Sequence, residues 1–283
     1  MTNVLWVGFG DIGHRALPQL LEHGYKVTGA RRSQPNGPYG PGLQLAIGNA
    51  SSSDSWQQWL AKRPASIVLT LTPSAFTEEA YQASYLQPVQ NLLLLLAEIP
   101  DYQPFIYFVS STSVYGHAKG AWVNETTAAK PDGFSGRTML ACEALLLQSG
   151  YPGAILRCSG IYGPGRLRLL ESVRSKSVQG RNEWTNRVHA DDVARAIVFI
   201  LERAKTNPAM EVIVVTDSYP ALHLEVVNWL AAQLGIISAE ATATTKATAR
   251  GSKRISNEKL KSFGFTFTYP SYKDGYSALI KTL

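Results

Sequence analysis

Residues 4–13 have the sequence VLWVGFGDIG, and they determine how the rest of the chain is interpreted. The apolar run 4–7 is typical of a buried strand, and Gly8, Gly10 and Gly13 follow it in the pattern Gly-x-Gly-x-x-Gly. The residues after the last glycine carry apolar side chains at helical spacing. A strand, a glycine turn and a helix in this order are typical of a dinucleotide-binding βαβ unit.

Each glycine has an expected role in such a unit. Gly8 permits the tight turn, Gly10 allows a pyrophosphate to approach the backbone, and Gly13 allows the helix to pack close to the strand. We expect the first helical N–H groups, at Asp11 and Ile12, to bind the phosphates together with the positive end of the helix dipole. The alternative is a βαβ unit with a glycine-rich turn that binds no ligand.

The end of the second expected strand, residues 25–28, indicates which cofactor would bind. An NAD-binding unit carries Asp or Glu about twenty residues after the glycines, where the carboxylate binds the ribose 2′-hydroxyl. This chain has Arg31 there, followed by Arg32. Because a guanidinium group presents a planar fork of donors that suits phosphate, we expect NADP, with NAD as the other possibility. The alternative is that Arg31 and Arg32 are solvated side chains in a loop and bind no phosphate.

The composition is that of an ordinary globular protein, with 283 residues, 45% of them hydrophobic, and a formal net charge of +6. Because the chain begins directly in a strand, we expect no signal peptide, and the longest apolar run, 92–97, is too short to cross a bilayer. Cys142 and Cys158 lack metal or redox spacing and are expected to be buried thiols in a reducing cytoplasm. The basic residues at 246–261 form no nucleic-acid motif. We therefore expect a small-molecule substrate, with an anionic one favoured by this charge, and neither nucleic acid nor membrane as a partner.

Strands and helices alternate through the first two-thirds of the chain, which favours the α/β class with a Rossmann-like, doubly wound parallel sheet. Further strands are expected at 43–47, 67–71, 105–109, 154–157 and 211–216. Helices are expected at 52–63, 78–98 with a kink at Pro88, 139–148, 190–204 and 222–234, and loops at 35–42 and 237–250.

Two domains are expected. A dinucleotide-binding domain would occupy residues 1–165, with sheet elements continuing to about 200, and a small α/β substrate lobe would occupy 166–283. Asn49 and Thr72 follow expected strands of the first domain. Since ligands of such folds bind at the carboxyl ends of the strands, we expect both residues at the cofactor.

Four further motifs follow one another in a fixed order: FIYFVSSTSVYG (105–116), LRCSGIYGPGR (156–166), RVHADDVARAI (187–197) and RISNEKLKSFGF (254–265). Together with the glycine turn they resemble the extended short-chain dehydrogenase/reductase family, which includes NAD-dependent epimerases and dehydratases of nucleotide sugars. The resemblance implies that Ser111 is the catalytic hydroxyl, which would hydrogen-bond a substrate oxygen where charge develops. A turn serine at the end of a strand is the alternative.

The resemblance also implies a catalytic Tyr, with a Lys four residues later, on the following helix. This chain has Ser135 and Met139 at those positions, in a register in which Glu143 aligns with a glutamate common in the family. A lysine charge about 4 Å from a phenol would lower its pKa by roughly three units, and methionine contributes none of this. Arg137 does not replace that charge, because it lies two residues from Ser135 on another side of the helix.

Tyr115 and His117 are the ionisable groups expected to act instead as acid or base, and an unperturbed histidine titrates near neutrality. Tyr115 and Lys119 match the pattern Tyr-x-x-x-Lys, but Gly116 interrupts the stretch between them, so helical proximity is not expected. A structural tyrosine and a plain surface histidine are the alternatives.

In the last third, His189, Asp191 and Asp192 are residue types that bind metals, but the sequence offers no further ligand in an obvious position, so we expect no metal site. An aspartate at the start of a helix is instead expected to cap its N-terminus. By resemblance, residues 162–165 shape a loop near the nicotinamide and Arg166 faces an anionic substrate.

Taken with the resemblance, these features predict a cytoplasmic NADP-dependent oxidoreductase or epimerase of an atypical short-chain dehydrogenase type. Its substrate would be a sugar nucleotide or a small carbonyl compound. The alternative is a non-catalytic NADP(H)-binding regulatory or sensor protein. Apolar residues at 92–96 and 140–147 offer surface for a homodimer, and would equally suit an ordinary core.

Overall fold

The structure, a computed structural model, describes residues 2–34, 42–178, 180–204, 209–236 and 251–282. The chain forms two compact units. The first comprises Met1–Val114, Phe134–Arg157 and Ala194–Ile213, and the second comprises Tyr115–Gly133, Cys158–Val193 and Val214–Leu283. Each unit is therefore assembled from separate stretches of the chain. The loops expected at 35–42 and 237–250 lie, apart from Gly42, outside the described residues.

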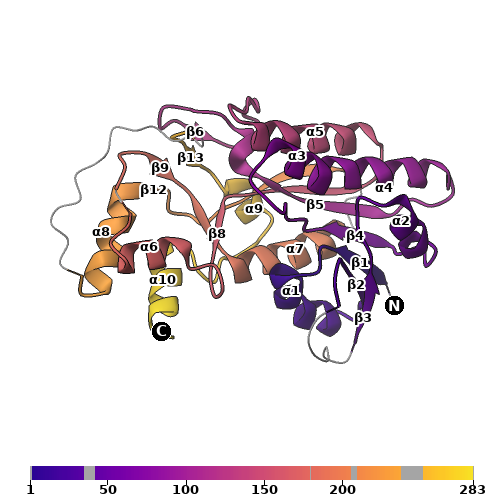
Figure 1. The fold of residues 1–283 in the computed structure, drawn as a ribbon, viewed down its shortest axis with the longest axis horizontal. Helices are drawn as coiled ribbons and strands as arrows, with labels where there is room; N and C mark the ends of the chain where they lie inside the picture. The colour runs from indigo at the N-terminus through magenta and orange to yellow at the C-terminus, as the bar shows by residue number, and fades with distance from the viewer. Residues whose placement is uncertain (1, 35–41, 179, 205–208, 237–250, 283) are drawn as a thin grey trace. The chain divides into compact units, whose positions relative to one another are not determined.

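A seven-stranded sheet has the order β11-β7-β5-β4-β1-β2-β3 (Figure 1). Its strands are β1 (Asn3–Val7), β2 (Lys26–Arg31), β3 (Leu43–Ile47), β4 (Ser66–Leu69), β5 (Phe105–Ser111), β7 (Gly153–Cys158) and β11 (Glu211–Val215). The four ladders that join β3, β2, β1, β4 and β5 are all parallel. The chain winds away from β1 in one direction and then returns to continue on its other side. This topology confirms the Rossmann-like α/β fold, with a ligand crevice expected at the carboxyl ends of β1 and β4.

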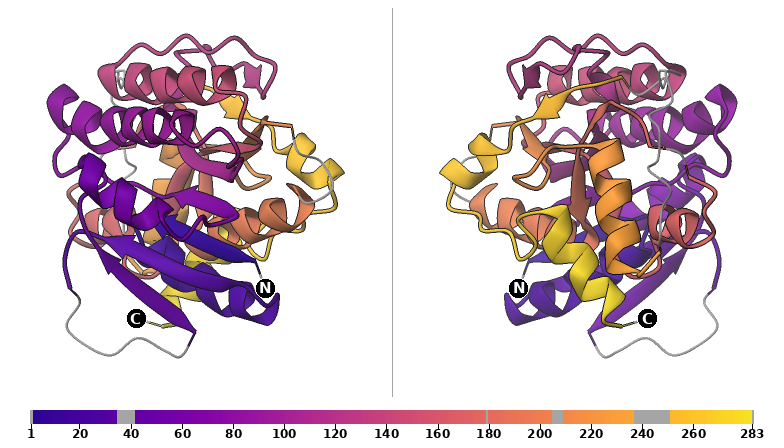
Figure 2. Two further views of the ribbon diagram at one scale, coloured as in Figure 1. Left: turned by 90° about the vertical axis from the view of Figure 1, so that its right-hand side faces the viewer. Right: turned by 90° about the vertical axis from the view of Figure 1, so that its left-hand side faces the viewer.

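Strand β1 lies at the centre of the core. Its side chains Val4, Leu5, Trp6 and Val7 are each at most 1% exposed. Helices α2 (Ser53–Leu60), α4 (Gln87–Ala97) and α5 (Phe134–Gln148) lie on one face of the sheet, and α1 (Asp11–Glu22) and α7 (Ala190–Ala204) on the other (Figures 1 and 2). Cover on both faces explains why the sequence of β1 is a continuous apolar run rather than an alternating one.

The helix expected at 78–98 forms as three consecutive segments: α3 (Glu78–Tyr81), the π-helical turn η1 (Gln82–Leu86) and α4. Pro88 explains the interruption. Its nitrogen has no hydrogen to donate to the carbonyl one turn earlier, and its ring crowds that carbonyl, so the preceding turn widens. The departure from α-helical geometry thus lies immediately before the proline.

The second unit contains short strand pairs and helices. The pairs are β8 (Gly160–Tyr162) with β10 (Arg187–His189), β9 (Trp184–Thr185) with β12 (Ala221–Leu222), and β6 (Trp122–Val123) with β13 (Arg254–Ile255). Helices α6 (Arg168–Arg174), α8 (His223–Gln233) and α10 (Tyr272–Ile280) share a core that includes Tyr162, Leu230 and Tyr276, and α9 (Glu258–Ser262) follows β13. Throughout the part of the chain that is described, every helix is too short or too polar to cross a membrane.

Candidate cofactor site and catalytic groups

The glycine turn after β1 is held by backbone groups on both neighbouring strands. The N–H of Gly8 donates to the carbonyl of Ala30 at the end of β2, at 2.9 Å. Gly8 has a φ of 81°, and a Cβ placed on it would lie 2.5 Å from the carbonyl oxygen of Thr70. The Thr70 hydroxyl donates to the Gly8 carbonyl at 3.0 Å and accepts from the Trp6 indole at 2.6 Å. The glycine pattern alone gives no indication of Thr70, because its role depends on the pairing of β4 with β1.

Gly10 and Gly13 differ in what surrounds them. A Cβ on Gly13 would lie 2.8 Å from the ring of Phe9, so this glycine makes room for an aromatic side chain inside the fold. Beyond its chain neighbours, a Cβ on Gly10 would have only the Gly8 carbonyl oxygen of the described residues within 4 Å, at 3.8 Å. Gly10 precedes α1 and makes no side-chain cap to its first N–H groups, which belong to Asp11 and Ile12. This arrangement fits the pyrophosphate of a dinucleotide.

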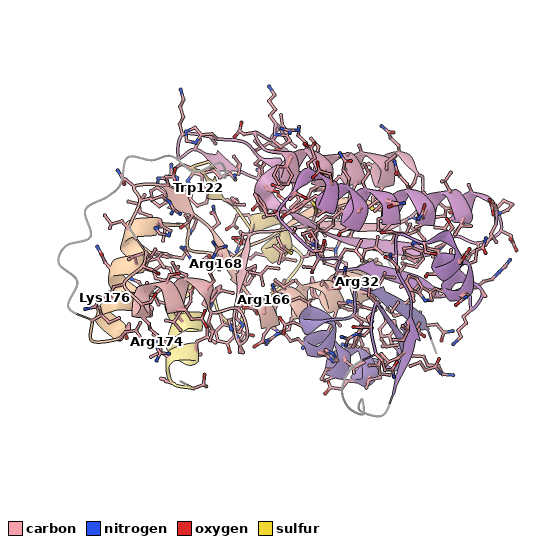
Figure 3. All side chains as sticks on the ribbon, in the orientation of Figure 1. Arg32, Trp122, Arg166, Arg168, Arg174 and Lys176 are labelled. Carbon is pink, nitrogen blue, oxygen red and sulfur yellow. The ribbon has the colours of Figure 1, made fainter. Side chains whose placement is uncertain are left out.

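The end of β2 provides positive charge in the same unit. Arg31 is the last residue of the strand and is half-buried, and Arg32, labelled in Figure 3, is exposed. His14 lies on the first turns of α1. Partial burial and the charge of Arg31 lower the pKa of His14 below its usual value, although Asp11 opposes them. The carboxylate of Asp11 also accepts from the Arg15 guanidinium at 2.8 Å. The sequence pattern does not reveal His14, because no motif relates it to Arg31.

Asn49 and Thr72 follow β3 and β4, and both are exposed. The side-chain oxygen of Asn49 accepts the N–H of Ser51 at 3.1 Å, and the Asn49 N–H donates to the Ser55 hydroxyl at 3.1 Å. These bonds fix the turn into α2. The roles of Asn49 and Thr72 at a cofactor stay predictions.

Ser111 ends β5, one residue before the 3-10 turn η2 (Thr112–Val114). The side chain is half-buried, and its hydroxyl oxygen accepts the N–H of Ser113 at 3.1 Å. A hydroxyl that accepts in this way still has its own proton to donate. Ser111 therefore lies at the carboxyl edge of the sheet with a hydroxyl that can still donate, and its catalytic role stays a prediction.

Directly before Ser111, Ser110 belongs to a buried polar network with α5 and β7. Its hydroxyl donates to Glu143 at 2.5 Å, and the Arg157 guanidinium bonds the same carboxylate at 2.6–3.1 Å. The Glu143 side chain is 0% exposed and that of Arg157 6%. The network joins the helix to two strands of the sheet and so fixes the register of α5 against Ser111's strand.

Tyr115 and His117 lie in the second unit. Tyr115 is 2% exposed, its hydroxyl donates to the Asn124 carbonyl at 2.7 Å, and its own carbonyl accepts from the Lys253 ammonium at 2.8 Å. His117 is exposed, and its Nδ1 accepts the N–H of Ser252 at 2.9 Å. Residues 115–119 are not helical, so the Tyr115–Lys119 spacing does not form a helical pair. These bonds favour a structural role for the tyrosine, while the catalytic roles of both residues stay predictions.

The cluster at the start of α7 makes structural bonds. Nδ1 of His189 accepts the N–H of Asp191 at 3.2 Å, so a histidine takes part in the capping that was expected of an aspartate. The carboxylate of Asp192 is 0% exposed and accepts two further N–H groups, from Thr268 and Tyr269, each at 2.8 Å. Asp192 therefore connects the helix to the segment before α10, a contact that no short sequence motif could indicate.

Exposed cations gather on and beside α6 in the second unit: Arg166, Arg168, Arg174 and Lys176 (Figure 3). The N–H of Arg166 donates to the Gly163 carbonyl at 2.9 Å and closes the turn at 162–165. The charges suit an anionic ligand, and the assignment of Arg166 to a substrate stays a prediction.

Asp217, after β11, carries a buried carboxyl group that no short sequence motif indicates. It is 1% exposed, Oδ1 accepts the Tyr219 N–H at 3.1 Å, and Oδ2 has no hydrogen-bond partner in the described structure. Burial raises the pKa of Asp217 to about 8, against the opposing effects of the Tyr219 hydrogen bond and the Arg187 charge.

The raised pKa of Asp217 predicts a pH-dependent stability. The folded state keeps the proton up to about pH 8, whereas the unfolded chain releases it near 3.8, so the free energy of unfolding should fall as pH rises between these values. Asp217→Asn has no proton to lose, so its stability relative to the wild type should increase by roughly 1.4 kcal/mol for each pH unit across this interval. Denaturant unfolding of both proteins at pH 5 and pH 8 measures this. An equal difference at both pH values would contradict it.

Comparison with known proteins identifies the family. The family model described as the NAD-dependent epimerase/dehydratase family matches residues 7–216. The chain belongs to this family. Protein YeeZ of Escherichia coli (strain K12) is 32% identical over 223 residues, which cover 72% of this chain and 75% of YeeZ.

Solved structures agree with the epimerase/dehydratase fold. A structure from Methylobacillus flagellatus, named as an NAD-dependent epimerase/dehydratase, is 34% identical with a TM-score of 0.82 and covers 99% of this chain and 98% of its own. MoeE5 in complex with UDP-glucose and NAD is 22% identical with a TM-score of 0.79, and the match covers 99% of this chain and 97% of MoeE5. The dTDP-glucose 4,6-dehydratase of Bacillus anthracis in complex with NAD is 19% identical with a TM-score of 0.80, and the match covers 99% of this chain and 96% of the dehydratase. The last two matches show a shared fold.

Within this epimerase/dehydratase fold, α5 carries the positions at which the resemblance implies a Tyr and a Lys. Ser135 is half-buried near the start of the helix, and Met139 is 3% exposed. Arg137 lies on another side, with a half-exposed guanidinium 4.0 Å from the Glu78 carboxylate. The arginine therefore does not stand in for a lysine at position 139.

Proposed function

We propose that the protein binds NADP(H) at the glycine turn, with Arg31 and Arg32 binding the 2′-phosphate. The chemistry at the end of β2 carries this proposal, since Arg31 occupies the place where a carboxylate would bind the 2′-hydroxyl of NAD. The open space at Gly10 supports it, because a side chain there would compete with the pyrophosphate. MoeE5 and the B. anthracis dehydratase are named as NAD complexes. NADP(H) would supply or accept hydride when bound.

For the chemistry, we propose an oxidoreductase or epimerase reaction at a carbonyl or alcohol carbon. The Ser111 hydroxyl would donate a hydrogen bond to the reacting oxygen, which stabilises charge that develops there. A sugar nucleotide is the proposed substrate, with a small carbonyl compound as the other choice, because MoeE5 is named with UDP-glucose and with UDP-glucuronic acid. The exposed guanidinium of Arg166 suits the diphosphate of such a substrate.

Hydrogen bonding supports His117 more than Tyr115 as the proposed proton donor. Because Nδ1 of His117 accepts a backbone N–H, the neutral ring carries its proton on Nε2. The hydroxyl proton of Tyr115 is already donated to a backbone carbonyl. His117 thus offers a donor of fixed tautomer from an exposed side chain.

Binding is tested by titrating the protein with NADPH and NADH, following nicotinamide fluorescence and the melting temperature. We expect NADPH to bind more tightly, and a concentration of 100 times Kd to add about 2.7 kcal/mol to the free energy of unfolding. Arg31→Ala should weaken NADPH about 10- to 100-fold and leave NADH nearly unchanged, since a hydrogen bond to a charged group is worth about 1.5–3 kcal/mol. Lys26→Ala is the matched control, because it removes one positive charge from the other end of the same strand. Absence of NADPH binding by both measurements would refute the proposal.

The second candidate is a non-catalytic NADP(H)-binding regulatory protein, favoured by Ser135 and Met139 at the implied catalytic positions. The two candidates differ in turnover. Reduction or epimerisation of any member of a panel of sugar nucleotides and small carbonyl compounds would exclude the regulatory candidate. A binding partner whose affinity changes between NADP and NADPH would support it.

A further inference from the structure

His14, on α1, is linked to β2 through the ring of Phe9. Its ring packs edge-on against Phe9, with centroids 4.8 Å apart and an interplanar angle of 73°. The Phe9 ring in turn fills the space beside two glycines, since a Cβ on Gly13 would lie 2.8 Å from it and one on Gly29 2.6 Å. Gly29 lies two residues before Arg31. Phe9 therefore links the first turns of α1, which carry His14, to the strand end that carries Arg31.

Charged groups on both elements act on His14. The charge of Arg31, on β2, lowers the His14 pKa, and the charge of Asp11, on α1 itself, raises it. The Asp11 carboxylate is shared with Arg15 at 2.8 Å, and Arg32 follows Arg31 directly. With burial and Arg31 as the two largest influences, the pKa of His14 lies below its usual value, and the ring is mostly neutral near pH 7 before any anion binds.

We infer that His14 and Arg31 together bind the 2′-phosphate of the cofactor, and that His14 takes up a proton when the phosphate binds. The inference rests on the proposed binding of NADP(H). A phosphate placed between the two cations would offset the repulsion from Arg31 and accept a hydrogen bond from the imidazolium. Its negative charge would therefore raise the His14 pKa in the complex.

If binding takes up a proton, the affinity for NADP depends on pH and is higher at lower pH. Between the His14 pKa of the free protein and that of the complex, each bound NADP brings a proton with it, so the affinity for NADP rises as pH falls. One coupled proton changes the affinity by at most about tenfold per pH unit. NAD has no 2′-phosphate and should show none of this effect. The 2′-phosphate itself also titrates, with a pKa of about 6, but it does so equally in a variant without His14.

The test is isothermal titration calorimetry of NADP⁺ and NAD⁺ from pH 5.5 to 8.5, in buffers of different ionisation enthalpy to count protons. For the wild type we expect uptake of up to one proton per NADP⁺ and a ratio of NADP⁺ to NAD⁺ affinity that rises about tenfold between pH 8 and pH 6. His14→Gln should lose most of this uptake and the rise. His23→Gln is the matched control, since this histidine lies at the other end of α1, and it should behave like the wild type.

The outcomes separate the inference from the proposed function. If His14→Gln keeps the wild-type proton uptake and pH profile while NADP⁺ is still preferred, His14 does not bind the phosphate and the inference is wrong. If the wild type binds no NADP⁺, the proposed cofactor and the inference both fail. If His14→Gln does not fold, the number of protons that the wild type takes up on binding is the deciding measurement. NADP⁺ binding without proton uptake would overturn the inference. Proton uptake with NADP⁺ but not with NAD⁺ would support it.

Discussion

Glu143→Leu is expected to lower the free energy of unfolding by about 3–5 kcal/mol, because it leaves the Arg157 guanidinium charged and unpaired inside the protein. Ser110 loses its acceptor in the same change. The loss is a large part of the stability of a domain, so the variant should be partly unfolded at physiological temperature. Urea denaturation followed by circular dichroism measures it.

A matched set of variants separates the loss of a partner from the loss of volume. Replacing all three polar groups, as Ser110→Ala, Glu143→Leu and Arg157→Met together, removes the unpaired charge, and should recover most of the stability that Glu143→Leu loses. Glu79→Leu, at an exposed glutamate on α3, controls for the loss of a charge and should change stability by less than about 0.5 kcal/mol. If Glu143→Leu cost no more than this control, the network would not stabilise α5.

The sequence predicted those parts of the fold that local patterns determine. Strand β3 (Leu43–Ile47) and helix α7 (Ala190–Ala204) have the expected bounds, because a short apolar run and an amphipathic repeat are complete within a few residues. The interruption near Pro88 was predictable from the missing N–H. The way in which each unit is assembled from distant stretches of the chain was harder to predict from the sequence. The strand pair of β6 and β13 joins residues more than a hundred positions apart, and neither strand has more than two residues.

The residues of the candidate site also fall into two groups, those that the sequence could predict and those that it could not. Gly8 and Gly13 could be interpreted from spacing, since tight turns and close packing restrict the residue type. Thr70 and His14 could not, because their roles depend on contacts with residues outside their own elements. Asp217 could not, because its raised pKa comes from burial in the folded protein. Tyr115 is anchored by a backbone carbonyl, which carries no sequence signal. On α5, Glu143 keeps its structural bonds while positions 135 and 139 are Ser and Met. This helix can therefore remain in place whether or not it contributes to catalysis.

The second large effect is expected from Gly10→Ala, which should weaken NADPH binding and leave the fold intact. Among the residues that the structure describes, the nearest atom to the added methyl group beyond its chain neighbours is the Gly8 carbonyl oxygen, at 3.8 Å. The free energy of unfolding should therefore change by no more than about 1 kcal/mol. The same methyl would stand where the pyrophosphate approaches the backbone. Steric overlap of this kind costs about 1–3 kcal/mol, which raises the Kd about 5- to 150-fold.

Two further glycines provide the controls for this measurement. Gly8→Ala should destabilise the protein itself, because its φ is 81° and its Cβ would lie 2.5 Å from the Thr70 carbonyl oxygen. Gly133→Ala should leave both stability and binding unchanged, since a Cβ there would lie more than 4 Å from every described heavy atom beyond its chain neighbours. Fluorescence titration with NADPH, beside thermal unfolding without it, distinguishes the three. Wild-type affinity in Gly10→Ala would mean that no pyrophosphate approaches this turn. The positive charge of Arg31 would then need another explanation, because the cofactor's 2′-phosphate reaches the end of β2 only when its pyrophosphate lies at the glycines.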